Sequence, residues 1–232
     1  MKCLLTRFKN ESHIMYEFIN HYLEEGVDNF ILIDDNSDDD YINLNKDWLD
    51  ELIKQKKVQI KKSKGSQVFD YNLYLKEIKK YYWVILCDMD EFMFGVQNNS
   101  TLKSILETKF LKYDYINIPW KLFKHTNYFQ PKSVINDNIL THSTETDNVS
   151  PSKGYKNIMK TKNISKIDIH KCNFSKKVNT YKFKDCHNKL IQNNHYRTQS
   201  NEYLYGVKEV RGGGVNKDKY KNFKRHYEYE FN

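Results

Sequence analysis

Residues 1–92 alternate short apolar runs with segments whose apolar side chains follow helical spacing. Between Ser12 and Gly26, apolar side chains recur three and four positions apart, which predicts a helix with one buried face. Ser12 is a typical helix-capping residue, and Gly26 stands where a helix commonly ends. The same spacing predicts further helices at 43–55 and 66–80.

Four apolar runs separate these helices and predict strands at 2–8, 29–33, 58–60 and 82–87. Continuous apolar runs are typical of parallel strands that are buried on both faces. The alternation of strand and helix therefore predicts an α/β fold with a mixed, mostly parallel sheet flanked by helices. Ligands of such sheets bind beyond the carboxyl ends of the strands.

The second half of the chain is less regular. A helix is expected at 101–110, a strand at 115–120, a polar loop at 136–154, short strands at 155–195 and polar helices at 200–230 with a break at 211–214. No internal repeat or linker is evident, so we expect a single domain over 1–232.

Composition supports a packed protein despite a mean hydropathy of -0.83, because aromatic residues make up 15% of the chain. The net charge is +8, but the lysines are dispersed and only four of the basic residues are arginine. A composition rich in lysine and poor in arginine is typical of an AT-rich genome, for example that of a large virus or a protist. The charge alone therefore gives little support to nucleic-acid binding.

Cysteines and apolar runs bear on location. The four cysteines are scattered, without the paired spacing of a zinc site, which favours a reducing compartment. No apolar run approaches the roughly 20 residues that span a bilayer. We therefore expect a soluble, cytoplasmic protein without a transmembrane segment, found in the host cytoplasm or the virion if the source is viral.

Two acidic segments follow predicted strands. Asp88 and Asp90 come directly after the 82–87 run, and side chains two apart share one face of a strand. Carboxylates at this spacing suit Mg²⁺ or Mn²⁺. The other segment, 34–39, reads as a nucleotide pocket or as a solvated turn that caps the next helix.

Several short motifs in this order resemble a GT-A-fold glycosyltransferase, most closely the family 2-like and family 92-like enzymes. The motifs are Lys9-Asn10-Glu11, the 34–39 turn, Gln67 with Tyr71-Asn72, the 83–92 segment, Trp120-x-x-Phe123, 167–170, Asn194-His195-Tyr196, and Ser200 with Lys208 and Arg211. The resemblance spans residues 2 to 214. It implies that 1–95 is the nucleotide-sugar-binding half and 96–232 the acceptor half. Lys124 and His125 depart from the small residues usual after the Trp-x-x-Phe motif.

The resemblance also implies roles for individual residues. The donor would be a nucleotide sugar, with a UDP-sugar as the first candidate. The acceptor would be a hydroxyl group of a glycan or protein, and the transfer would invert the configuration at the transferred carbon. Donor-binding residues would be Arg7, Lys9, Asn10, Glu11, Asp34, Asp35, Lys64, Gln67, Asp88, Lys208 and Arg211. Manganese or magnesium would be held by Asp88, Asp90 and a histidine, with His170 preferred over His195. Trp120 and Phe123 would contact the acceptor, and the general base would be Glu145, Asp147 or Glu91, with Asp168 a further option.

Three other hypotheses remain at this stage. A haloacid-dehalogenase-type phosphatase also uses Asp-x-Asp after a strand, but normally at the first strand of its domain rather than at Asp88. A basic nucleic-acid-binding or structural module would need exposed aromatic residues along a basic stripe. A glycosyltransferase-like module kept for binding would not need both Asp88 and Asp90.

Overall fold

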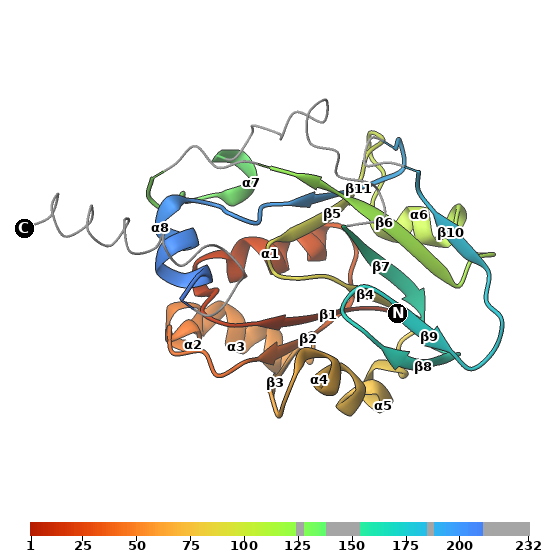
Figure 1. Ribbon diagram of the computed structural model, residues 1–232, viewed down its shortest axis with the longest axis horizontal. Coiled ribbons are helices and arrows are strands. Elements are labelled where there is room, and N and C mark those ends of the chain that lie inside the picture. The colour runs from red at the N-terminus through yellow and green to blue at the C-terminus, as the bar shows by residue number, and fades with distance from the viewer. Residues whose placement is uncertain (124–127, 138–153, 185–187, 211–232) are drawn as a thin grey trace, which may run out of the picture. The chain divides into compact units, whose positions relative to one another are not determined.

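The computed structural model describes residues 1–123, 128–137, 154–184 and 188–210 (Figure 1). The strands are β1 (Lys2–Phe8), β2 (Asn29–Asp34), β3 (Val58–Lys62), β4 (Trp83–Leu86), β5 (Glu91–Gly95), β6 (Tyr115–Leu122), β7 (Tyr155–Lys160), β8 (Ile164–Ile167), β9 (Cys172–Phe174), β10 (Thr180–Lys182) and β11 (Ile191–His195). The helices are α1 (Ser12–Glu24), α2 (Tyr41–Leu44), α3 (Lys46–Lys54), α4 (Gln67–Leu73), α5 (Leu75–Ile78), α6 (Leu102–Thr108), α7 (Val134–Asp137), α8 (Asn201–Tyr203) and the π-helical turn η1 (Leu204–Lys208).

Nine strands form one mixed sheet in the order β3-β2-β1-β4-β7-β6-β11-β5, and β10 pairs with β6. The first four of these strands are parallel to one another. Strand β7 runs antiparallel to both β4 and β6, and β11 runs antiparallel to β5. Strands β8 and β9 form a separate two-stranded sheet. The expected α/β class with a mixed sheet is confirmed.

Helices cover both faces of the parallel strands (Figure 1). Side chains that alternate along β1 point to opposite faces, and Cys3 and Leu5 join a core with Tyr71 and Ile78 of α4 and α5. On the other side, α1 buries its apolar face, including Phe18, which packs edge-on against Phe92 of β5 with ring centroids 5.8 Å apart. The strands are therefore shielded from water on both faces.

Two predicted helices are each divided in the structure. The 43–55 helix is α2 followed by α3, with a break at Asn45, and the 66–80 helix is α4 followed by α5, with a break at Tyr74. Ser12 is the first residue of α1 rather than its cap, and its N–H donates to Asp39 Oδ2 at 2.7 Å. The acidic turn therefore supplies a hydrogen bond to the start of α1.

The chain divides into two compact units, residues 1–121 with 144–195, and residues 122–143 with 196–232. The division at residue 95 that the resemblance implied stays a prediction. In the second unit, Ser200 caps α8 by accepting the N–H of Tyr203, and its hydroxyl donates to Gln130 Oε1 at 2.9 Å. No helix among the described residues is long and apolar enough to cross a membrane.

Candidate functional site

The Asp88-Met89-Asp90 segment connects β4 to β5 at the carboxyl end of β4. Leu86, the last residue of β4, pairs with Leu5 of the parallel strand β1, which ends three residues later at Phe8. The chain continues from Asp90 directly into β5, a strand that the sequence did not reveal. The acidic pair and the end of β1 thus share one edge of the sheet, where ligands of α/β sheets bind.

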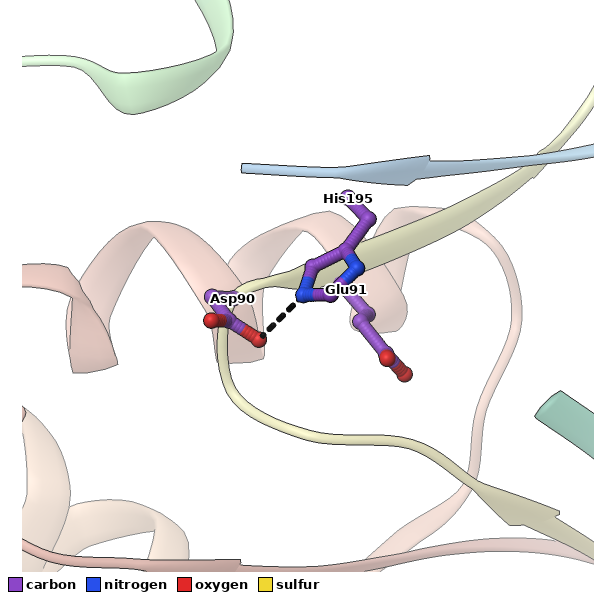
Figure 2. A group of neighbouring side chains, drawn as sticks. All are labelled: Asp90, Glu91 and His195. Carbon is purple, nitrogen blue, oxygen red and sulfur yellow. Dashed lines mark ion pairs between the residues drawn. The ribbon is translucent and has the colours of Figure 1, made fainter. Parts of the chain in front are cut away.

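Strand β11 brings a histidine to this segment. In the antiparallel register of β5 and β11, His195 is opposite Glu91. His195 Nε2 lies 3.4 Å from Asp90 Oδ1, and Asp90, Glu91 and His195 offer one ligand atom each within 4.8 Å of one another (Figure 2). Their exposed fractions are 3%, 0% and 5%. Glu91 Oε1 and His195 Nδ1 are buried without a hydrogen-bond partner among the described residues.

These donors fit a divalent cation of the Mg²⁺ or Mn²⁺ type. Carboxylate oxygens suit both ions, and an imidazole nitrogen favours Mn²⁺ of the two. Two nearly buried ligands that approach to 3.4 Å, beside a Glu91 Oε1 that accepts no hydrogen bond from the described residues, form a cradle in which a cation would supply a further interaction.

Lys156 of β7 also contacts the acidic segment. Its Nζ is 2.8 Å from Asp88 Oδ2 and 3.8 Å from Glu91 Oε1, and its side chain is 0% exposed. Glu91 Oε2 also accepts the backbone N–H of Asp88 at 3.0 Å. Asp88 itself is 35% exposed, and its Oδ1 lies 3.4 Å from Gln67 Nε2. Both oxygens of Asp88 are therefore held by the protein.

Burial and charge have opposite effects on these groups. Burial alone would lower the pKa of Lys156, but the Asp88 and Glu91 carboxylates outweigh it and raise the pKa above its ordinary value. Burial raises the pKa of Glu91 well above that of an exposed glutamate, and the Asp88 and Asp90 charges add to the increase. Lys156 is therefore a charged ammonium group in the protein interior.

The aromatic ring of Trp120 lies beside His195. The Trp120 ring is 4.5 Å from the His195 ring and 5.6 Å from the His170 ring, centroid to centroid. Gly154 makes this position possible, because a Cβ there would lie 2.1 Å from Trp120 Cε3. The structure thus places His195 beside Asp90, whereas the His170 ring packs against the rings of Trp120 and Tyr155. Burial lowers the pKa of His170, which leaves its imidazole neutral.

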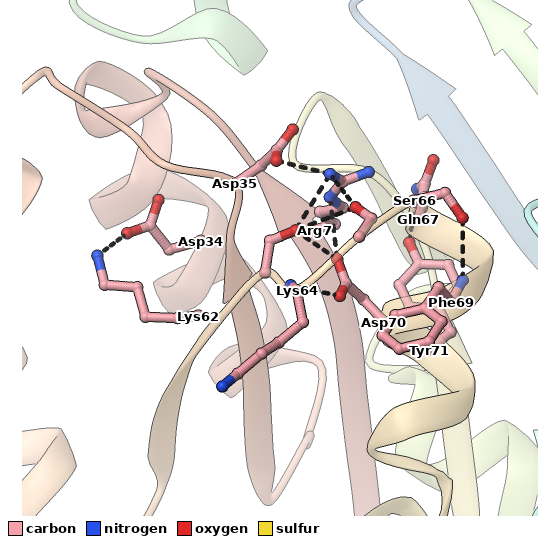
Figure 3. A network of polar contacts seen from close by, with 12 residues as sticks. Arg7, Asp34, Asp35, Lys62, Lys64, Ser66, Gln67, Phe69, Asp70 and Tyr71 are labelled. Carbon is pink, nitrogen blue, oxygen red and sulfur yellow. Dashed lines mark hydrogen bonds and ion pairs between the residues drawn. The ribbon is translucent and has the colours of Figure 1, made fainter.

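A second polar cluster surrounds Arg7 at the end of β1 (Figure 3). Arg7 Nη2 lies 2.6 Å from Asp35 Oδ1 and 3.2 Å from Ser63 Oγ, and Nε lies 3.5 Å from Asp70 Oδ2. Asp70 is fully buried and accepts the Ser63 hydroxyl at 2.6 Å and the Lys64 N–H at 2.8 Å. Arg7 and Asp35 are therefore fixed in position while parts of both stay exposed.

The neighbouring Asp34 has a structural role. It is 0% exposed and accepts hydrogen bonds from the Ser37 N–H, the Tyr41 hydroxyl and Lys62. Burial would raise the pKa of Asp34, but the bonds from Lys62 and Ser37 outweigh it and hold the pKa below its ordinary value. Asn10 joins the same turn, since its N–H donates to Ser37 Oγ and its Oδ1 accepts from Asp38. The 34–39 turn thus accepts a hydrogen bond from the start of α1 and also holds Asp35 in position beside Arg7.

The remaining predicted site residues fall in several places. In the first unit, Glu11 is buried, Lys9 and Gln67 are half-buried, Lys64 has an exposed side chain, and the Asp168 carboxylate accepts the N–H of Ile169. In the second unit, Phe123 stacks on Tyr196, and Lys208 donates to the carbonyl of Arg197. Glu145, Asp147 and Arg211 lie outside the described residues.

Sequence reasoning missed Lys156, Asp70 and Ser63. A lysine within a strand is normally read as solvent-facing, and only the strand order reveals that β7 lies next to β4, beside the acidic segment. Asp70 had a weak signal, because a carboxylate in the first turn of a helix is commonly a structural partner.

Comparisons with known proteins gave structural neighbours only. No family model matches the chain, and no curated protein matches it. Among solved structures, S. aureus TarS 1-349 has a TM-score of 0.48 at 11% identity, covering 90% of this chain and 63% of that chain. HddC from Yersinia pseudotuberculosis has a TM-score of 0.43 at 12% identity, covering 90% and 99%. Mannosyltransferase PcManGT from Pyrobaculum calidifontis, in complex with GDP-Man and Mn2+, has a TM-score of 0.39 at 12% identity, covering 50% and 34%.

The chain spans less than two thirds of the TarS chain that it matches. At these identities the likeness concerns the arrangement of strands and helices alone. Membership of the family 2-like or family 92-like enzymes and a viral source stay predictions.

Proposed function

We propose that this protein is a metal-dependent glycosyltransferase of the GT-A type. It transfers a sugar from a nucleotide sugar to a hydroxyl group of a glycan or protein, with inversion at the transferred carbon. The first candidate donor is a UDP-sugar. The proposal rests on the motifs of the sequence and on one structural observation. That observation is the distance of 3.4 Å between Asp90 Oδ1 and His195 Nε2, two residues far apart in sequence. They lie at the edge of the sheet that also carries Arg7 and Asp35.

Each part of this edge would have its own task. Asp90 and His195 would hold Mn²⁺ or Mg²⁺, with Glu91 adjacent, and the ion would stabilise negative charge on the departing diphosphate. Asp35, fixed by Arg7, would accept a hydrogen bond from an N–H of the base. Arg7 presents guanidinium N–H groups to the same region, and Asp88, held by Lys156 and Gln67, presents a fixed acceptor toward a donor hydroxyl.

The general base belongs to a residue that reaches the acceptor. Glu91 is completely buried and its carboxylate faces the Asp88 N–H and Lys156, so we assign it to the support of the cation site. Glu145 and Asp147 remain the proposed bases, since a base must come within hydrogen-bond reach of the acceptor hydroxyl. Trp120, half-buried beside His195, stays the proposed contact for the acceptor.

The test is a thermal-shift series with UDP, GDP and their sugars, each with and without Mn²⁺. A ligand that binds only the folded protein stabilises it by about 2.7 kcal/mol at a concentration 100 times its Kd. We expect a rise in Tm with UDP or a UDP-sugar that requires Mn²⁺, and we expect Asp90→Asn to abolish it. Asp47→Asn, an exposed aspartate at the start of α3, is the matched control and should keep the full response.

A cooperative melt with no response to any nucleotide, with or without Mn²⁺, would refute the donor site. A response that survives in Asp90→Asn would instead refute the assignment of the cation ligands. The release of UDP then measures hydrolysis of the UDP-sugar that raises Tm. This assay tests cleavage of the donor bond without a known acceptor.

A further inference from the structure

Lys156 is a buried cation whose role the proposed transfer reaction does not explain. It lies on β7 with its side chain 0% exposed, so it reaches neither solvent nor a donor directly. A lysine is rarely buried without a partner, because removing an ammonium group from water costs several kcal/mol. The partners here are the carboxylates of Asp88, at 2.8 Å, and Glu91, at 3.8 Å.

The two aspartates of the Asp-x-Asp segment therefore have different surroundings. Asp88 Oδ2 contacts the Lys156 ammonium group and Oδ1 faces Gln67 Nε2 at 3.4 Å. Asp90 Oδ1 faces the imidazole Nε2 of His195 at 3.4 Å. An ammonium group beside Asp88 opposes a cation in electrostatic terms, whereas the imidazole nitrogen beside Asp90 offers a ligand atom for one.

We propose that Lys156 is a positioning residue that keeps Asp88 out of the cation's ligand set and leaves Asp90 and His195 to hold the ion. The inference rests on the proposed metal-dependent function and goes beyond it, since it separates two carboxylates that the motif alone treats as equivalent. Asp88, fixed at both oxygens, then serves as a rigid acceptor on the exposed side of the site.

The charge of Lys156 also affects how the site accepts a donor. Asp88 and Asp90 lie in one short segment, and their carboxylates would repel a diphosphate. Lys156 offsets part of this negative charge from inside the protein. Its removal is therefore expected to change the affinities for the cation and for the nucleotide in opposite directions.

The experiment measures Mn²⁺ affinity directly, from the electron paramagnetic resonance signal of free Mn²⁺, with and without UDP. In wild type and in each variant, folding is checked by the melting transition. We expect Asp90→Asn to weaken Mn²⁺ binding by at least about tenfold and Asp88→Asn to change it by less than about threefold, because only Asp90 is a direct ligand.

Lys156→Met tests the positioning role itself. Methionine has nearly the same length without the charge, so Asp88 is released and Mn²⁺ binding without UDP should tighten on the order of tenfold. The double variant Lys156→Met with Asp88→Asn should lose this gain, while UDP binding in Lys156→Met should weaken. Lys160→Met is the control, since Lys160 is on the same strand but pairs with Asp114 at 3.5 Å and the Leu111 carbonyl.

The outcomes separate this inference from the proposed function. If wild type binds no Mn²⁺ with or without UDP, the cation site and this inference are both wrong. If wild type binds Mn²⁺ but Asp88→Asn loses it as fully as Asp90→Asn, the function stands and the positioning role is refuted. Weaker binding of both Mn²⁺ and UDP in a folded Lys156→Met would also refute it, as a purely structural lysine gives that result. If Lys156→Met does not fold, the comparison of Asp88→Asn with Asp90→Asn decides.

Discussion

Gly154 sets how closely Trp120 approaches His195 in the proposed cation site, and its replacement by alanine gives a quantitative test of that arrangement. The added Cβ would lie 2.1 Å from Trp120 Cε3, whereas ordinary contacts begin at 3.4 Å, so the ring must retreat by about 1.3 Å (3.4 minus 2.1). Gly154 also accepts the N–H of Trp120 at 3.0 Å, which prevents the two backbones from simply separating. The strain therefore falls on the indole ring and on its contact with His195.

Overpacking of this kind costs about 1–3 kcal/mol. We expect the free energy of unfolding in urea to fall by about that amount with an unchanged m-value, and Tm to fall by roughly 2–4 °C for each kcal/mol in a chain of this size. The Mn²⁺-dependent response to UDP should weaken in the same variant, because the ring beside His195 has moved.

Gly206 in η1 provides the matched control. A Cβ at Gly206 meets nothing within 4 Å, and its φ is not positive. Gly206→Ala should leave stability unchanged or raise it by about 0.5–1 kcal/mol, since alanine restricts the unfolded chain. If Gly154→Ala is as stable as wild type and binds UDP equally well, the close contact between residue 154 and the indole is wrong.

Variants of His195, Asp34 and Asp70 test three other contacts. His195→Ala should remove the Mn²⁺-dependent rise in Tm while His170→Ala keeps it, and equal losses would contradict the placement of His195 at Asp90. The lowered pKa of Asp34 means that its contribution to stability is present above about pH 4 and is lost as pH falls through its folded pKa, so Asp34→Asn should flatten the acid limb of a stability–pH curve. Asp70→Asn should lower the free energy of unfolding by about 1–3 kcal/mol in urea, and a loss no larger than that of exposed Asp38→Asn would refute its supporting role.

Strands β1 to β4 were predictable because their apolar positions stand between helices that have a clear apolar face. The breaks at Asn45 and Tyr74 were not, because apolar spacing continues across both positions and neither is a glycine or proline. Strand β5 was also not predictable from the sequence, because its first residue is the charged Glu91, which the fold buries completely.

The candidate site was predictable in its acidic half. Asp88 and Asp90 follow a strand in sequence, so local pattern finds them. Which histidine joins them depends on a pairing between strands about 100 residues apart, and nothing local distinguishes His170 from His195. Lys156 depends likewise on the neighbours of β7 in the sheet.

The pairing of β5 with β11 has a consequence for how this chain tolerates changes in length. An extra residue in the connection before β11 can be absorbed without moving the strand. An extra residue within β11 would put Asn194 or its neighbour opposite Glu91 and turn the His195 side chain to the other face of the sheet. The side chain opposite Glu91 thus depends on the spacing of a five-residue strand, and an insertion there would replace the imidazole of the proposed cation site with another side chain.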